Sequence, residues 1–511
     1  MVLIPILLAV VFGPVEQGAS KINAESPGDT VTTQVTVKLR TGGSVTGLLV
    51  DHTSQGLVLV RDRTPFVFSW NDLKPESACH VRRELLIWER GGADRLTAAD
   101  QFELGTLALR VERTTFAANA FAAAKKLDPS LQSKVQDALA KHRAARRATN
   151  GNTGSFDGNG DENNGLPSHT LGSDEDPNDS DEPVSEDLPG NDNGKSAAAT
   201  FELVGLPGPD TPESQEELRR QVMDVYRTFG AKVQEVLGKD VALVETDHYL
   251  IWTDWPAAEQ DRLAGWCEAM YAALCRQFEI DPKAPVFLAK CPVFCWKDKT
   301  RFRRFAREFD GYGATDAIGY TRSIAKTGHT HVVVLSQGHS EIDLNRFAST
   351  LVHEGTHAFL HRLYTTNLIP HWVNEGLADM TAERVLGDRC DNAERAAMLA
   401  WAYVRYDWPI DDLLTITGPI GVEAYPLAHS VVKYMNHLGS EKFAAFVKAL
   451  KEGETVPQAL QGHFGIPSNA DLERQWREWV RTSDPAPRVN DTNGTARSGI
   501  PPIEARSSNG S

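Results

Sequence analysis

The sequence predicts an α+β protein, and three observations support this prediction. Apolar residues alternate with a period of two near the N-terminus, and a helical pattern follows them. After residue 200, strand-like segments precede two helical segments that carry histidines and carboxylates. The chain has 511 residues, 41% of them hydrophobic, which is enough for two or three domains with sizeable cores.

Residues 1–20 resemble a secretory signal peptide. An apolar run from Val2 to Phe12 is followed by Gly18, Ala19 and Ser20, and it is too short to span a bilayer as a mature helix. No Lys or Arg precedes the run, so the alternatives are a start site that omits the basic region or a short membrane anchor. We predict an exported protein, located in the periplasm, in the cell envelope or outside the cell, with no membrane span in the mature chain.

Residues 32–80 are predicted to form a small β-domain. Apolar residues alternate at Val35, Val37, Leu39, Leu57, Leu59, Phe66, Phe68 and Trp70. Four or five short strands in this space predict an SH3-like β-barrel, similar in pattern to the small barrels fused to exported bacterial enzymes. A structural cap without a ligand is at least as good an interpretation as a binding module.

Residues 85–148 are helical in pattern. Gly105, Ala117, Phe121, Ala124 and Pro129 have the spacing of one tetratricopeptide unit. Such units bury their faces by stacking, and the sequence shows no second copy. We therefore expect this segment to pack against the barrel and not to capture peptides.

Residues 149–199 are predicted to be an acidic, disordered linker, because they contain almost no apolar residue. Twelve acidic residues and one lysine between positions 150 and 195 account for most of the formal net charge of −16. The chain lacks the basic footprint of a nucleic-acid-binding protein. Residues 157–161 begin like a calcium loop, but Glu162 and Ser168 replace the glycine and the bidentate glutamate that such a loop needs. Residues 483–511 are predicted to be a disordered tail.

The six cysteines are too few for a disulfide scaffold. Cys267 and Cys275 are eight residues apart on a predicted helix, about 12 Å, which is too far to pair. Cys291 and Cys295 flank a turn-like stretch, where a bridge can form in an oxidising compartment. A zinc site at this pair would need two further ligands.

Residues 200–482 are predicted to form the largest domain. Residues 241–252, 286–289 and 331–335 are predicted strands, and residues 257–278 a predicted helix. A further helix starts near Leu344, and Phe347, Leu351, Ala358 and Leu363 form its apolar side. Gly355 in this helix costs about 1 kcal/mol relative to Ala, so we expect either close packing there or a close approach near the metal.

The most informative pattern is His353-Glu354-Gly355-Thr356-His357. Residues four apart lie on the same face of a helix, so the two imidazoles can bind one zinc ion with Glu354 beside a metal-bound water. A catalytic zinc usually has three protein ligands and a water. His361 is a poor third ligand because it lies one turn further along the helix, and position 363, where a histidine would complete another known pattern, is leucine.

Glu375 remains as the third ligand, eighteen residues after His357, on a second helix that follows a turn. Asp379 lies one turn after Glu375 on the same face, where it can accept the free N–H of a ligand histidine. A polar surface face of one helix is the competing interpretation. Against it, the motif lies among Leu351, Val352, Ala358 and Phe359.

The pattern H-E-x-x-H followed by W-x-N-E-G-L-A-D (residues 372–379) resembles the gluzincin branch of zinc metallopeptidases, in the peptidase-MA-like superfamily. The resemblance covers about residues 240–479 and is strongest to secreted bacterial members. It implies a zincin-like domain in which His353, His357 and Glu375 bind one Zn²⁺ ion, Glu354 is the general base and Asp379 orients a histidine. It also implies that Tyr425 stabilises the oxyanion, with Tyr434 and His371 as rivals.

The resemblance implies hydrolysis of a peptide or protein substrate by a zinc-activated water. The G-A-M-E-N signature of the aminopeptidase relatives is missing before residues 331–335, so we expect an endopeptidase, with that strand as a possible edge for the substrate. A catalytically silent zincin-fold binding or scaffold protein of the cell envelope is the alternative, although the intact Glu354 argues against it. Amide hydrolysis in cell-wall material is a third hypothesis.

Overall fold

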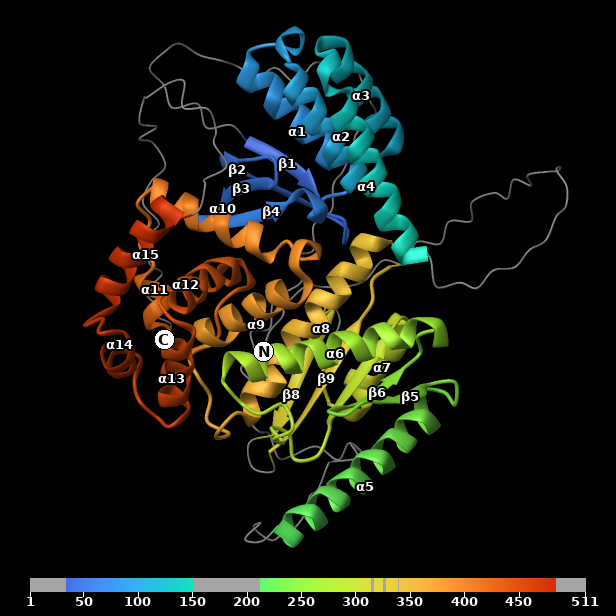
Figure 1. The fold of residues 1–511 in the computed structure, drawn as a ribbon, viewed down its shortest axis with the longest axis vertical. Coiled ribbons are helices and arrows are strands. Elements are labelled where there is room, and N and C mark those ends of the chain that lie inside the picture. The colour runs from blue at the N-terminus through green and yellow to red at the C-terminus, as the bar shows by residue number, and fades with distance from the viewer. Residues whose placement is uncertain (1–33, 151–211, 314–316, 325–327, 339, 484–511) are drawn as a thin grey trace, which may run out of the picture.

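The computed structural model describes residues 34–150, 212–313, 317–324, 328–338 and 340–483. The predicted signal peptide, nearly all of the acidic linker with its calcium-loop-like residues, and the predicted tail after Ser483 lie outside the described residues. Figure 1 shows an N-terminal module of four strands and several helices above a larger part with a five-stranded sheet. The predicted α+β class is therefore confirmed.

The first sheet is an antiparallel meander in the order β1-β2-β3-β4, with β1 (Gln34–Lys38), β2 (Ser44–His52), β3 (Gly56–Arg61) and β4 (Thr64–Ser69). In the described residues no ladder joins β1 to β4, and a single bridge links Leu39 to Leu73. The prediction of a closed barrel was therefore wrong. The alternation of apolar residues was read correctly, but it does not determine whether the last strand returns to the first.

Four helices complete the N-terminal module: α1 (Pro75–Arg90), α2 (Ala98–Arg110), α3 (Thr114–Leu127) and α4 (Gln132–Asn150). Helix α1 begins inside the segment that was predicted to belong to the barrel, because Pro75 stands at the first helical position. The residues with tetratricopeptide spacing in α2 and α3 are buried: Gly105, Ala117, Phe121 and Ala124. Leu57 and Leu59 of β3 pack with α1 and α2 in one apolar core.

The second sheet is mixed and has the strand order β5-β6-β7-β9-β8, with β5 (Ala242–Glu245), β6 (Tyr249–Thr253), β7 (Cys291–Trp296), β8 (Gly319–Ile324) and β9 (His329–Leu335). Strands β6, β7 and β9 run parallel, and both outer strands are antiparallel to their neighbours. Helices α5 (Pro212–Leu237) and α7 (Lys299–Phe309) cover one face, and α6 (Ala257–Gln277) and α8 (Glu341–Arg362) cover the other.

Three strand predictions in this domain need correction. Residues 241–252 form the hairpin β5–β6 and not one strand, and residues 286–289 are not a strand. Strand β9 lies between β7 and β8, so it offers no free edge, and the outer strand is β8. The central strands are buried on both faces, which hides the alternation on which the predictions relied.

The bridge considered between Cys291 and Cys295 does not form, because both residues lie in β7 and not beside a turn. Residues four apart in a strand are separated by about 13 Å, beyond the reach of a disulfide. All six cysteines are free and buried, as the prediction for Cys267 and Cys275 required.

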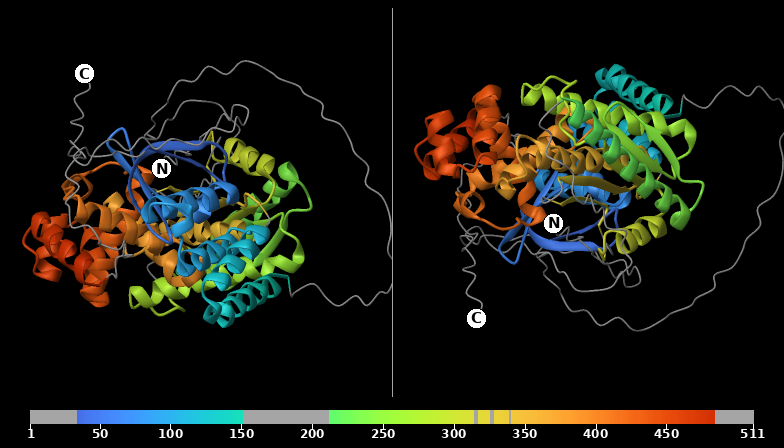
Figure 2. Two further views of the ribbon diagram at one scale, coloured as in Figure 1. Left: turned by 90° about the horizontal axis from the view of Figure 1, so that it is seen from above. Right: turned by 90° about the horizontal axis from the view of Figure 1, so that it is seen from below.

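The remaining helices stack beside α8: α9 (His371–Leu386), α10 (Asn392–Arg405), α11 (Asp411–Thr415), α12 (Tyr425–His437), α13 (Ser440–Lys451), α14 (Val456–Phe464) and α15 (Asn469–Ser483). No helix in the described residues combines the length and the apolar character needed to cross a membrane. Views from above and below show the red C-terminal helices to one side, beyond the N-terminal module (Figure 2).

Candidate metal centre

The motif predicted to bind metal lies in the second half of α8. This helix begins with a capping box in which the Ser340 hydroxyl accepts the Asp343 N–H and the Asp343 carboxylate accepts from Ser340. The apolar side of α8 is buried, as predicted. The face with His353 and His357 is directed toward α9, because His353 contacts Glu375 of that helix. Gly355 is a site of close packing, because a Cβ atom would lie about 2.5 Å from Met270 of α6. Gly355 therefore permits the contact between α6 and α8.

Three ligand-type atoms converge between α8 and α9. The distance between the Nε2 atoms of His353 and His357 is 3.1 Å. Oε2 of Glu375 lies 3.1 Å from Nε2 of His353 and 3.3 Å from Nε2 of His357. Within the described residues these three side chains are the group that could hold a metal ion, and we call them the metal group. Glu375 is only 1% exposed.

Asp379 lies where the sequence predicts it, one turn after Glu375. Its Oδ1 atom is 2.8 Å from Nδ1 of His353 and also accepts a hydrogen bond from the side-chain amide of Asn392 at 3.0 Å. When the neutral imidazole of His353 donates from Nδ1 to Asp379, Nε2 is the nitrogen that keeps a lone pair for a metal ion. Nδ1 of His357 has no hydrogen-bond partner in the described residues, so the two imidazoles are held differently.

The charges of this group are strongly coupled. Burial disfavours a charged imidazole, but the carboxylates of Asp379 and Glu375 raise the pKa of His353 well above its usual value. Burial alone would raise the pKa of Glu375, but His357 and His353 hold it well below its usual range. Glu375 is thus an ionised carboxylate in an apolar surrounding, and the two imidazoles form its ion-pair contacts among the described residues.

Glu354 is buried next to this group, and Thr321 of β8 fixes its carboxylate. The Thr321 hydroxyl lies 3.0 Å from Oε2 of Glu354 and 2.6 Å from the backbone oxygen of the same residue. Burial is the main reason that the pKa of Glu354 is raised, and the two histidines oppose this shift. A carboxylate with a raised pKa, beside a metal group, is suited to taking up and releasing a proton. Sequence reasoning missed Thr321 because β8 was not predicted.

Tyr425, the first residue of α12, is the tyrosine that the fold brings to the group. Its ring lies parallel to that of His353, with centroids 5.9 Å apart. Burial, followed by the charges of Glu375 and Glu354, raises the pKa of Tyr425 well above its usual value. Gly376 permits this approach of α12, because a Cβ atom there would lie 2.5 Å from the backbone oxygen of Ala428.

The two rival residues and His361 differ in their surroundings. The Tyr434 hydroxyl lies 3.2 Å from Oε1 of Gln475, and its ring packs against Trp479, so it is part of the helix packing. His371 is the first residue of α9, one turn before Glu375. His361 is buried outside the group, and burial together with Lys451 lowers its pKa to about 4. Neither of its ring nitrogens has a hydrogen-bond partner in the described residues.

A cavity of about 500 Å³ opens onto the metal group. His353, Glu354, Asp379 and Tyr425 lie on its wall, together with residues of α10 and of the N-terminal module. The helical segments that carry the predicted site residues are therefore assembled at one hollow of the surface. Its size is within the range of small-molecule and peptide-binding clefts.

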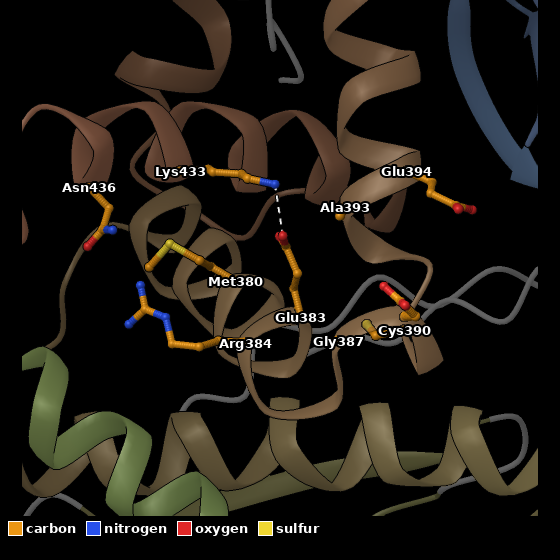
Figure 3. Close-up of a pocket in the computed structure, with 10 residues that line it drawn as sticks. Met380, Glu383, Arg384, Gly387, Cys390, Ala393, Glu394, Lys433 and Asn436 are labelled. Carbon is orange, nitrogen blue, oxygen red and sulfur yellow. Dashed lines mark hydrogen bonds and ion pairs between the residues drawn. The ribbon is translucent and has the colours of Figure 1, made fainter. Parts of the chain in front are cut away.

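A second cavity, of about 440 Å³, adjoins the first at the C-terminal end of α9 (Figure 3). Both cavities are lined by Asp388, Cys390 and Glu394. In the second cavity Glu383 of α9 faces Lys433 of α12 at 2.8 Å (Figure 3). Burial opposes the charge on Glu383, but His429 and Lys433 lower the pKa of Glu383 to about 2.

A scan against models of protein families finds no match to this chain, and a search of curated proteins finds no similar sequence.

Proposed function

We propose that this chain is an exported, zinc-dependent endopeptidase of the gluzincin type. The observation that carries the proposal is the convergence of His353, His357 and Glu375 beside the buried carboxylate of Glu354. Export is proposed from the signal-like residues 1–20, which lie outside the described residues.

The donor set fits zinc in type and in geometry. Imidazole nitrogens and a carboxylate oxygen bind Zn²⁺ at about 2.0–2.2 Å, so two ligand atoms of a tetrahedral site are separated by about 3.3–3.6 Å. The three distances between the donor atoms are 3.1, 3.1 and 3.3 Å. Three protein ligands leave the fourth position of a tetrahedron free, as in catalytic zinc sites.

When bound, zinc would supply a Lewis acid that lowers the pKa of a coordinated water to about 7 and polarises the scissile carbonyl. Glu354 would accept the proton of the attacking water and later deliver it to the leaving amine. Tyr425 would donate a hydrogen bond from its phenol to the developing oxyanion, and its raised pKa keeps this proton in place. Asp379 would hold His353 in the tautomer that offers Nε2 to the metal.

Strand β8 is the part of the sheet that can align an extended substrate. It is the outer strand next to β9, and its Thr321 contacts Glu354 directly. A peptide that adds to an outer strand is held through its backbone, independently of its sequence. This mode of binding suits an endopeptidase, because it needs no free terminus.

The test is peptide-library cleavage by the zinc-loaded full chain and by its Glu354→Gln variant. The substitution leaves all three ligands in place and removes the base, so we expect zinc to remain bound and cleavage to fall at least a hundredfold. Glu383→Gln is the matched control: it changes a partly buried glutamate of the second cavity and should retain cleavage within about threefold.

Each outcome distinguishes the hypotheses. No cleavage of any peptide by the zinc-bound parent would contradict the proposal and favour the catalytically silent scaffold. Cleavage of cell-wall fragments but of no peptide would favour an amidase. Equal loss of cleavage in Glu354→Gln and in Glu383→Gln would indicate that the loss reports folding and not catalysis.

A further inference from the structure

One wall of the cavity at the metal group comes from the N-terminal module. Thr41, Asn71, Asp72, Arg110 and Glu112 line the same cavity as Glu354 and Tyr425. These residues precede α8 by at least 229 positions in the sequence. The module therefore contributes to the same hollow as the metal group, and any substrate in that hollow would contact it.

Asp72 joins the module to α8, which carries His353 and His357, and to α10. Its Oδ1 atom accepts a hydrogen bond from Nη2 of Arg346 at 2.6 Å, and Arg395 donates to the same oxygen. The same Arg346 nitrogen donates to the backbone oxygen of Asn71 at 2.9 Å. Arg346 belongs to α8 and Arg395 to α10, so one carboxylate links two helices of the larger domain.

Both arginines are close in sequence to residues that hold the metal group. Arg346 precedes His353 by two turns of α8. Arg395 follows Asn392 by one turn of α10, and the Asn392 amide donates to Asp379, which holds His353. Asp72 therefore holds α8 through Arg346 and α10 through Arg395. A shift of either helix would displace His353.

The module is fixed to the larger domain by its core as well as by charge. Val50, Val58, Val60 and Val67 of the first sheet belong to the same apolar core as α8, α9 and α10. The hydroxyl of Tyr406, the residue that follows α10, donates to the backbone oxygen of Val50 at 2.8 Å. Figure 1 shows α10 lying directly below this sheet. Removal of the module would thus expose the core of the larger domain.

We propose that the N-terminal module is part of the functional unit: it forms a wall of the substrate cavity, and Asp72 is a positioning residue for the metal group. This inference rests on the metal centre of the proposed function and not on the reaction assigned to it. It replaces the interpretation of the module as a cap that packs without a role at the site.

The first test compares Asp72→Asn with Asp100→Asn in the full chain loaded with Co²⁺. The two aspartates are matched, because each closes a capping box and pairs with arginine, but Asp100 pairs with Arg90 inside the module. We expect Asp72→Asn to weaken Co²⁺ binding about threefold to tenfold and to change the visible absorption spectrum of the ion. Asp100→Asn should leave affinity and spectrum as in the parent.

Parental affinity and spectrum in Asp72→Asn, or equal changes in both variants, would overturn the role of Asp72. If Asp72→Asn does not fold, Arg346→Gln breaks the same contact from α8 and leaves Asp72 paired with Arg395. The expected change has the same direction and is smaller. A variant that folds and keeps the parental spectrum would again contradict the proposal.

The second test examines the wall itself with Thr41→Trp, an exposed turn residue that lines the cavity, and with Thr115→Trp, an exposed position of α3 away from it. The probe is the rate at which dipicolinate removes Co²⁺, which needs no substrate. We expect removal to slow at least threefold in Thr41→Trp only, and KM for a cleaved peptide to rise with unchanged kcat. Equal rates of Co²⁺ removal from both variants would contradict the proposal that the module forms a wall of the cavity. If no peptide is cleaved, the proposed function fails while the Co²⁺ comparisons still decide this inference.

Discussion

Two glutamates of α9, two turns apart, show how neighbouring carboxylates acquire different roles. Glu375 is 1% exposed and contacts the imidazoles of His353 and His357. Glu383 contacts His429 at 2.9 Å and the ammonium of Lys433 at 2.8 Å. Both carboxylates are held ionised by their neighbours, but only Glu383 has a permanent cation as a partner.

Glu375 and Glu383 differ in how their negative charge is balanced. At Glu383 the Lys433 ammonium balances the carboxylate, and no convergent set of three ligand atoms forms there in the described residues. At Glu375 three atoms with lone pairs meet within about 3 Å, and such a cluster is stable when a cation or protons lie between them. The comparison distinguishes Glu375, which belongs to a group that could hold a metal ion, from Glu383, which is half of an ion pair with Lys433.

The largest expected effect separates these two roles by metal binding. Glu375→Gln should weaken zinc binding to the full chain at least a hundredfold, because it removes one of three ligands. Glu383→Gln should bind one zinc ion with the affinity of the parent. Titration calorimetry with metal analysis measures both, and equal affinities in the two variants would show that the comparison is wrong.

A smaller effect is expected for the two tyrosines of α12. Tyr425→Phe should lower kcat about a hundredfold with zinc still bound, because loss of one oxyanion donor costs about that much. Tyr434→Phe loses the contact with Gln475 and should leave kcat within about twofold. Steady-state kinetics on one cleaved peptide decides between them, and the opposite ranking would reassign the oxyanion residue.

The smallest effect concerns the pH dependence of stability. The pKa of Glu383 is lowered to about 2, so its ion pair stabilises the fold above pH ~4.5 and loses this contribution as the pH falls toward 2. After allowance for solvent screening, Glu383→Gln should lower the free energy of unfolding by about 1–3 kcal/mol at pH 7. Urea unfolding should give the same difference in unfolding free energy between the parent and the variant at pH 7 and at pH 5.5. The difference should be smaller at pH 3.5. A difference in unfolding free energy that grows as the pH falls would contradict the assignment of Glu383 to a stabilising ion pair.

The residues of the metal group could be predicted because their spacing along helices determines their geometry. His353 and His357 share a helical face, and Asp379 repeats the position of Glu375 one turn later, so local periodicity was sufficient. Glu375 required a second helix folded against the first, which the turn after Leu363 made predictable. The structure brings all four residues together, while zinc binding and catalysis remain predictions.

The long-range parts of the site could not be predicted from one sequence. Thr321 reaches Glu354 through β8, whose residues show no clear alternation. Asn392 and Asp72 act through packing of α10 and the first sheet, and no local pattern encodes which face of that sheet meets which helix. Closure of the predicted barrel failed for the same reason, because pairing between distant strands depends on tertiary contacts.

X-ray absorption spectroscopy of the full chain with one zinc ion bound would examine the proposed ligands themselves. The account predicts imidazole scattering from two histidines and a shell of nitrogen and oxygen ligands at about 2.0–2.2 Å, with one histidine contribution lost in His357→Ala. Sulfur ligands at about 2.3 Å, or a spectrum that does not change in His357→Ala, would place the zinc elsewhere and contradict the account.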